Sequence, residues 1–358
     1  MLALMVLGAL LLVIVLLIIT ALVLDASLNT GTNAYPSALH LAVLFVKLFL
    51  APLLKGSTWK KLVRQDSPEL DEETLTRVIP FTPKPSHLRA FHTVCSLSEK
   101  EGEMPALYPA VILIYPNVCI FGASSYPFPA IGTVHVCNTT TVYSKLSAED
   151  SYRCVLKPNR KIAHVKKGSE VEFLSTLMRV SSGSNNNDKK KEKEVIIWSN
   201  SSSFLVMHNQ RKKAAVEASS SSAWTAPEAA ELTLLHETQW TLSANASVEY
   251  AHVSKDFNPI HMSSLLAKLF GFPGIIMHGM YLITRAASEC QNVLQKETKK
   301  EIVYPFQIST KFQRPCVLPQ KPTFSVFQMK SAPGNLYFTV KGKGEKILLD
   351  GYLKTTKI

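Results

Sequence analysis

Cysteine is scarce in this sequence, and its spacing excludes two common kinds of site. Six cysteines are spread over 358 residues, and no two of them form a CxxC pair. Structural zinc sites and disulfide frameworks usually place their cysteines at short, regular spacings. The sequence therefore predicts no metal site and no disulfide framework, and we expect the cysteines to be reduced.

Acidic residues are also few relative to basic ones. The sequence holds 39 Lys and Arg against 27 Asp and Glu, which gives a formal net charge of +12. Such an excess favours anionic partners: nucleic acid, acidic lipid, phosphorylated cofactors or an acidic carrier protein. The lysine-rich segment 181–194 has no interleaved aromatic residues and no base-reading motif. We therefore expect no nucleic-acid partner.

Charge is absent from residues 2–24, which are almost entirely apolar. At ~1.5 Å per residue this segment is long enough to cross a hydrocarbon core of about 30 Å. It lacks the basic leading region and the shorter apolar core of a cleaved signal peptide, so a retained anchor is favoured over a signal peptide. Residues 1–55 are accordingly predicted to form a membrane anchor.

A second apolar segment, 38–54, is shorter and contains His40 and Lys47. It could span the membrane, lie in the interface or complete a hairpin, and the sequence leaves these three readings open. Basic residues are frequent after residue 55, which predicts that the rest of the chain faces the cytosol, at the endoplasmic reticulum or another organelle membrane. A luminal domain could instead be glycosylated at the three sequons of the chain, Asn138, Asn200 and Asn245.

The remainder divides into two halves at polar, low-complexity segments. Residues 181–194 contain no apolar residue and lie between two strand-like runs, which predicts a solvated hairpin tip. Residues 211–231 are typical of a flexible linker. The sequence therefore predicts domains at 84–210 and 232–358.

Each half repeats one order of elements, an apolar helix followed by strands. The predicted helices are 106–124 and 279–295, both apolar enough to be buried. The predicted strands are 132–144, 152–165, 170–180 and 194–208 in the first half, and 304–313, 321–329, 335–342 and 346–356 in the second. This order predicts an α+β fold in which an antiparallel sheet wraps a helix, twice over.

Histidines and glycines gather between residues 256 and 280. Asn258-Pro259 is typical of a helix start, because Asn is a preferred N-cap and Pro fits the first helical position. His261 would then be third in the helix, where the positive end of the helix dipole favours a neutral ring. Asp256 lies two residues before the cap, so its carboxylate and the His261 ring could hold one water molecule between them. Alternatively, Asp256 only shares the capping and His261 is a packed surface histidine.

His278 and Gly279 stand immediately before the second apolar helix. A backbone N–H at the start of a buried helix is a good donor to a developing oxyanion, such as a polarised thioester carbonyl. We expect Gly279 to supply that N–H, because glycine has no side chain to block approach. For His278 we expect a structural role, in which it fixes the turn by hydrogen bonds.

The segments SKDFNPIH and GFPGIIMHGM, at this separation, resemble the signature of the MaoC-like dehydratases, which include the R-specific enoyl-CoA hydratases. A thinner likeness extends to KFQRPCVLPQKPTFSVFQ. The resemblance implies a hot-dog fold, a long helix wrapped by an antiparallel sheet. The first half is similar to the non-catalytic leading domain of two-domain members, since it has no Asp-x-Asn-Pro-x-His motif. A double hot-dog with an N-terminal transmembrane segment is therefore expected.

The resemblance also assigns roles to residues of the second half. Asp256 and His261 match the catalytic pair, Asn258 the orienting cap, and Gly279 the donor to the thioester. Two positions depart from the family pattern: Lys255 stands where a glycine usually precedes the aspartate, and Ala287 where some hydratases have a serine.

The implied activity is a reversible syn hydration of trans-2-enoyl-CoA, or of a carrier-bound enoyl group, to the (3R)-3-hydroxyacyl thioester. No cofactor is expected, because the thioester brings its own phosphopantetheine. Lys311 and Arg314 are candidates to contact CoA phosphates, the alternative being solvated surface residues. A homodimer is compatible with the sequence, which does not determine the oligomeric state. The other functions considered are a non-catalytic, membrane-tethered acyl-binding protein and a hot-dog thioesterase.

Overall fold

The computed structural model describes residues 69–130, 133–180, 194–208, 225–299 and 302–355. The predicted anchor at 1–55, with its second apolar segment at 38–54, lies outside these residues. Within the described ranges, no helix is long and apolar enough to cross a membrane. Most of the predicted hairpin tip and linker also fall outside them.

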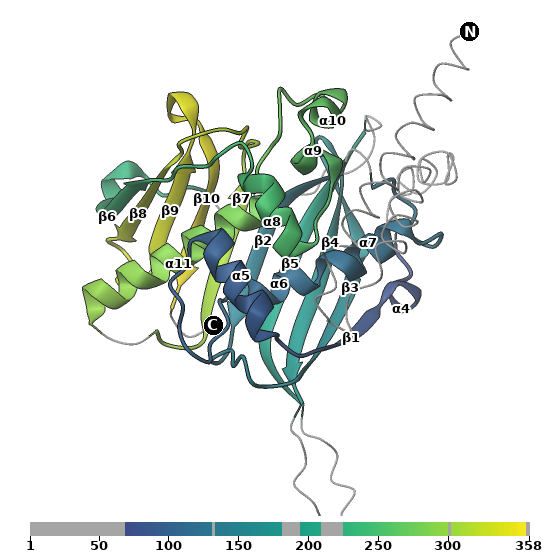
Figure 1. Ribbon diagram of the computed structural model, residues 1–358, viewed down its shortest axis with the longest axis horizontal. Helices are drawn as coiled ribbons and strands as arrows, with labels where there is room; N and C mark the ends of the chain where they lie inside the picture. The colour runs from purple at the N-terminus through teal and green to yellow at the C-terminus, as the bar shows by residue number, and fades with distance from the viewer. Residues whose placement is uncertain (1–68, 131–132, 181–193, 209–224, 300–301, 356–358) are drawn as a thin grey trace, which may run out of the picture.

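One antiparallel sheet of ten strands runs through the described part of both halves (Figure 1). In spatial order the strands are β1 (Arg77–Phe81), β3 (Tyr152–Val165), β4 (Gly168–Arg179), β5 (Val195–Met207), β2 (Thr133–Val142), β7 (Phe306–Phe312), β10 (Ile347–Lys354), β9 (Leu336–Lys341), β8 (Thr323–Met329) and β6 (Leu232–Gln239). The halves join where β2 pairs with β7, from Cys137 opposite Lys311 to Val142 opposite Phe306.

The order of the sheet is the same when read outward in either direction from that junction. Each half gives the first strand after its central helix, then the fourth, third and second, and finally the strand that precedes the helix. This pseudo-twofold arrangement confirms the predicted α+β double hot-dog. The predicted domain boundaries themselves remain predictions.

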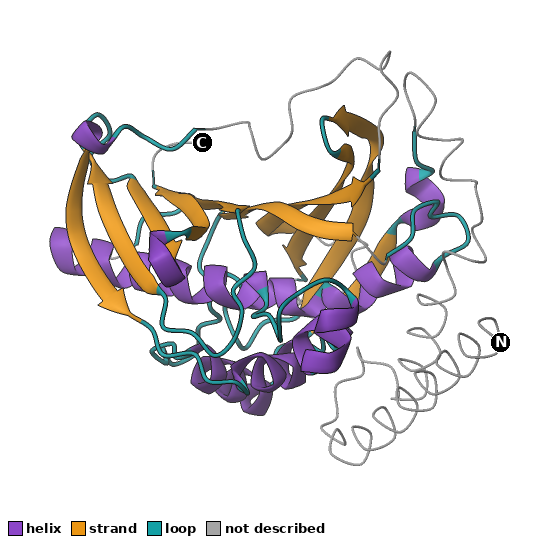
Figure 2. Ribbon diagram, turned by 90° about the horizontal axis from the view of Figure 1, so that it is seen from above, coloured by secondary structure: helices purple, strands orange, loops and turns teal. Residues whose placement is uncertain are grey.

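The helices gather on one face of the curved sheet (Figure 2). They are α4 (Glu72–Leu75), α5 (Pro85–Cys95), α6 (Tyr108–Ile112) and α7 (Ile114–Gly122) in the first half, and α8 (Ala246–Ser254), α9 (Pro259–Met262), α10 (Ser264–Leu269) and α11 (Gly279–Thr298) in the second, with short 3-10 turns at η2 (Ala229–Glu231) and η3 (Lys343–Glu345). The long helix α11 packs against β7, β8 and β9. The predicted helix at 279–295 is therefore confirmed.

The single helix predicted at 106–124 is wrong, because two short helices, α6 and α7, meet at Leu113. Pro116 explains the break. In a continuous helix its ring would clash with the carbonyl oxygen of Ile112, and it has no N–H to bond to that oxygen. The chain therefore ends α6 at Ile112 and starts again at Ile114.

All eight predicted strands form, with ends that differ by at most two residues. Sequence analysis missed the outer strands β1 and β6 and the helices α5 and α8. β1 has only five residues and contains Pro80, which is tolerated on an edge strand but argues against a strand in the sequence. β6 is mostly exposed and lacks the alternation of a half-buried strand.

Two local features occur in both halves, and they show which residue of one half corresponds to which residue of the other. Phe91 packs edge-on against Tyr108 with ring centroids 5.2 Å apart, and Tyr250 packs edge-on against Tyr281 at 5.6 Å. Helix α5 ends at Ser96 and α8 at Lys255, both in the left-handed conformation, with φ of 54° and 60°. The α5–α6 region is therefore the counterpart of the region from α8 to α11.

Candidate active site

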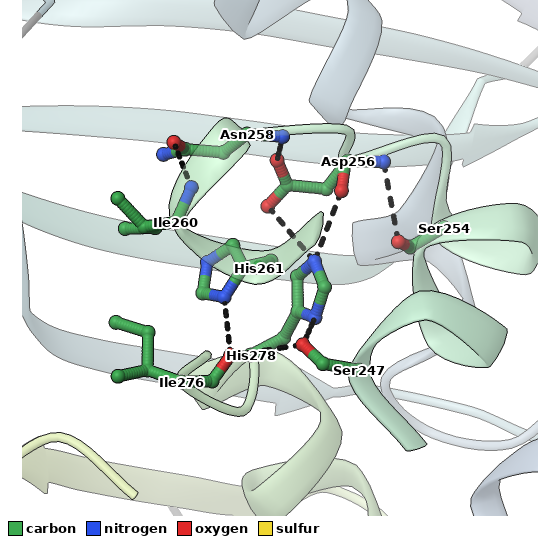
Figure 3. A network of polar contacts seen from close by, with 8 residues as sticks. All are labelled: Ser247, Ser254, Asp256, Asn258, Ile260, His261, Ile276 and His278. Carbon is green, nitrogen blue, oxygen red and sulfur yellow. Dashed lines mark hydrogen bonds and ion pairs between the residues drawn. The ribbon is translucent and has the colours of Figure 1, made fainter. Parts of the chain in front are cut away.

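The site lies between the end of α8 and the start of α11 (Figure 3). The Asn258 side chain caps α9 by accepting a hydrogen bond from the Ile260 N–H at 3.4 Å. His261 is the third residue of that helix, so the helix start read from the sequence is confirmed. Asp256 precedes the cap, and its Oδ1 accepts from the Asn258 N–H at 3.3 Å.

The backbone conformation of Lys255, the first departure from the family pattern, explains why a glycine is usual at this position. Its φ of 60° lies in the left-handed region, which glycine adopts most easily. A glycine is thus the natural residue here, and a lysine holds the same turn with some strain. Burial lowers the pKa of Lys255 to about 8.

The ring of His261 is buried and its tautomer is fixed. Nδ1 lies 2.7 Å from the Ile276 carbonyl oxygen, which can only accept, so Nδ1 carries the hydrogen. The lone pair of the neutral ring is therefore on Nε2. Burial lowers the pKa of His261, against the opposing effects of the Asp256 charge and the Ile276 hydrogen bond. The neutral ring is as predicted, but its main cause is burial and not the dipole of the four-residue α9.

His278 is buried beneath His261. The two rings stack with centroids 3.7 Å apart and planes 22° apart. Nε2 of His278 donates to the Asp256 backbone carbonyl at 3.0 Å, and Nδ1 lies 3.0 Å from the Ser247 hydroxyl. Burial first, and His261 second, hold the pKa of His278 well below its usual range. A neutral ring makes no ion pair with the Asp256 carboxylate 3.9 Å away, so its contacts orient the turn and support the His261 ring.

The structure brings three potential ligand groups together, since one atom from each of Asp256, His261 and His278 lies within 4.8 Å of the others. Both nitrogens of His278 are engaged, and Nδ1 of His261 bonds to Ile276. What remains is one lone pair on His261 Nε2 and the Asp256 carboxylate, whose side chain is 29% exposed. Two acceptors at this separation suit a water molecule better than a metal ion, which would need further ligands.

Gly279 is the first residue of α11 and directly follows His278. The first N–H groups of a helix have no partner one turn back, so they are available to a ligand oxygen. A Cβ at this position would lie 2.7 Å from the Phe312 ring. Glycine is therefore required by the packing of β7 against the helix start as well as by access.

The two basic candidates are not brought to the site. Phe312 faces Gly279, and side chains alternate along a strand, so Lys311 points to the opposite face of the sheet. Arg314 follows β7, where its guanidinium donates to the Ile347 carbonyl at 3.0 Å. The structure thus places Lys311 on the face of the sheet away from Gly279, which argues against a CoA phosphate contact.

The side chains that support the site from behind were not predicted from the sequence. Ser247 contacts His278, the Ser254 hydroxyl accepts from the Asp256 N–H at 3.2 Å, and the buried Tyr250 ring lies 4.9 Å from the His278 ring. All three belong to α8. Because α8 was not predicted, nothing in the sequence indicated which of its side chains face the motif.

Comparisons with known proteins match the part of the chain that contains this site. A family model described as MaoC like domain matches residues 226–326. 3-Hydroxyacyl-thioester dehydratase X of Mycobacterium tuberculosis is 26% identical over 238 residues, which cover 66% of this chain and 73% of that protein. Fatty acid synthase subunit beta of Aspergillus oryzae is 54% identical over 43 residues, which span 12% of this chain and 2% of that protein.

Solved structures share the fold. A crystal structure of HtdX from Mycobacterium tuberculosis superposes with a TM-score of 0.56 at 22% identity, over 78% of this chain and 100% of that one. A MaoC-like dehydratase from Phytophthora capsici gives a TM-score of 0.57 at 16% identity, over 84% and 99% of the two chains. The chain therefore carries a MaoC-like domain in its second half and is a relative of the MaoC-like dehydratases.

Proposed function

We propose that the chain is a hydro-lyase that hydrates trans-2-enoyl thioesters to (3R)-3-hydroxyacyl thioesters, and catalyses the reverse dehydration. One observation carries the proposal. A ring nitrogen of His261 and an Asp256 carboxylate oxygen lie within 4.8 Å of each other and of His278, the residue before the first N–H of α11. The hydrogen bond from Nδ1 to Ile276 leaves the lone pair of His261 on Nε2. The dehydratase relative from Mycobacterium tuberculosis supports the same reaction class.

In the forward reaction, the thioester carbonyl oxygen accepts from the Gly279 N–H, which draws electron density away from C3. A water molecule bound between Asp256 and His261 forms a new O–C3 bond and gives up one proton to the pair. The electron pair of the C2–C3 double bond moves to C2, which takes one proton from the same side of the substrate. The pair thus ends with the protons it began with, so the residues perform general acid–base catalysis.

A direct assay separates this function from its rivals. Purified full-length protein in detergent is incubated with crotonyl-CoA, and the absorbance of the conjugated enoyl group and the release of free thiol are followed together. Hydration removes the absorbance without free thiol and gives the (3R) product on chiral chromatography. Free thiol would indicate a thioesterase, and no change would leave an acyl-binding protein.

We further propose that residues 1–55 anchor the enzyme in an organelle membrane with its catalytic half facing the cytosol, and that it needs no cofactor beyond the thioester handle. The charge-free segment 2–24 and the basic residues after residue 55 support the topology. Asn245 is the exposed sequon that reports on it, since Asn138 and Asn200 have buried side chains. In cells we expect no glycosidase-sensitive mass shift, and a shift abolished by Asn245→Gln would place the domain in the lumen.

A further inference from the structure

The pseudo-twofold relation assigns each residue of the catalytic region a counterpart in the first half. Counting from the paired left-handed residues Ser96 and Lys255, Leu97 stands where Asp256 does. Counting back from the paired rings of Tyr108 and Tyr281, the counterpart of Gly279 is residue 106 and that of His278 is residue 105. The first half therefore has leucine and proline in place of the aspartate and the stacked histidine.

A cavity of about 340 Å³ lies where this counterpart falls. Its walls include Leu97 and residues 104–107 from the first half, and the face of α11 between Thr284 and Gln295 from the second. Asp256, His261, His278 and Gly279 are not among its lining residues. The volume falls in the range of roughly 300 to 1,000 Å³ that small-molecule sites occupy.

His92 supplies an unusual feature of the cavity wall. The side chain is only 5% exposed, and within the described residues its Nδ1 has no hydrogen-bond partner. Burial lowers the pKa of His92, against the effects of Glu99 and of a hydrogen bond to the Ser98 backbone. The ring is therefore neutral, with its hydrogen on the nitrogen that bonds to Ser98 and its lone pair on Nδ1. This nitrogen is covered on the cavity side as well as from solvent, so the His92 ring contributes packing surface to the wall and offers no acceptor to a ligand.

The rest of the wall combines apolar, amide and cationic groups. Leu107, Val142 and Phe306 provide apolar surface, and α11 contributes Gln291 and Gln295. The cations stand beside these groups: Lys100 Nζ lies 3.4 Å from Gln295 Oε1, and Lys145 Nζ lies 2.5 Å from Glu103. Two lysines against one glutamate leave a net positive charge for an anionic end of a ligand.

We propose that this cavity is a second, non-catalytic site for a phosphopantetheine arm. Such an arm has amide groups for Gln295, a branched apolar segment for the apolar wall, and a phosphate for Lys100 and Lys145. The ligand class rests on the proposed function, because pseudo-symmetry relates the cavity to the place where the thioester would lie. Without counterparts of Asp256 and His278, an arm held here is bound but not converted.

Equilibrium dialysis of the full-length protein in detergent against labelled 4′-phosphopantetheine tests the site without requiring turnover. Gln291→Trp fills the cavity from α11, and Gln291→Ala is the matched control that leaves it open. Residue 291 lies about 18 Å along the helix from Gly279, at ~1.5 Å per residue, so both variants should keep the wild-type kcat on crotonyl-CoA.

We expect Gln291→Trp to bind one molecule per chain fewer than wild type and Gln291→Ala, with kcat and melting temperature unchanged. An equal number bound to all three proteins, no saturable binding to wild type, or a parallel loss of kcat would overturn the proposal. A repeat with CoA identifies the source, since tighter binding of CoA favours the coenzyme and weaker binding favours a carrier protein. Failure to hydrate crotonyl-CoA would refute the proposed function alone, because the binding count does not depend on turnover.

Discussion

Asp256→Asn separates the chemistry of the site from its fold. The Asp256 backbone holds the turn through Ser254 and His278, and its side chain makes one hydrogen bond, from the Asn258 N–H to Oδ1. An asparagine keeps an oxygen for that bond and loses only the negative charge. We therefore expect the free energy of unfolding to change by less than about 0.5 kcal/mol, as for a surface substitution.

The catalytic rate should respond very differently. General acid–base catalysis contributes about 10² to 10⁴ in rate, which corresponds to roughly 3 to 5 kcal/mol of activation free energy. We expect kcat/KM of Asp256→Asn on crotonyl-CoA to fall at least about 100-fold, measured by the loss of enoyl absorbance, with urea unfolding of the same preparation as the control. A variant that folds normally and keeps more than a tenth of the wild-type kcat/KM would refute the assignment of Asp256 to the chemistry.

Three further predictions follow from the same geometry. The His261 pKa is lowered and the neutral ring is the base, so kcat/KM should be flat near neutral pH and fall only below the ordinary histidine value of about 6.5; a decline that begins above pH 7 would contradict this. Gly279→Ala puts a Cβ 2.7 Å from the Phe312 ring and should cost about 1 to 3 kcal/mol in urea unfolding, with partial recovery in the double variant with Phe312→Leu. Lys311→Ala should leave KM for crotonyl-CoA unchanged within about twofold, because the side chain lies on the far face of the sheet.

The strands and the motif turn were predictable because their signals are local. An Asn-Pro pair defines a helix start by itself, and eight strand-like runs between polar breaks became eight strands. The side chains of α8 that support the site were not predictable in this way. Ser247 and Tyr250 face His278 only because α8 packs beside the motif, and that packing depends on contacts between segments far apart in the chain.

Lys311 shows a different limit of sequence reasoning. The alternation of Lys311 and Phe312 along a strand is visible in the sequence, and it guarantees that the two side chains face opposite sides of the sheet. It does not say which side carries the helices. That answer comes from the contact of Phe312 with Gly279, a meeting of β7 with the start of α11. One long-range contact therefore argues against a residue that charge alone had favoured.

The tautomer of His261 links the fold most directly to the proposed chemistry. Burying an imidazole removes its charge, but burial alone does not decide which nitrogen keeps the lone pair. The Ile276 carbonyl oxygen decides it by accepting from Nδ1, and Ile276 is held in turn by an isolated bridge to Val317 and by its own N–H, which donates to Ile260. The lone pair of the base is thus fixed on Nε2 by backbone that makes no contact with substrate in the proposed reaction. The first half has only a short connection between α5 and α6, with no helix equivalent to α9, so it has no residue in the place of His261 for a backbone carbonyl to orient. This absence explains, in physical terms, why one half of a nearly symmetric sheet would react and the other would only bind.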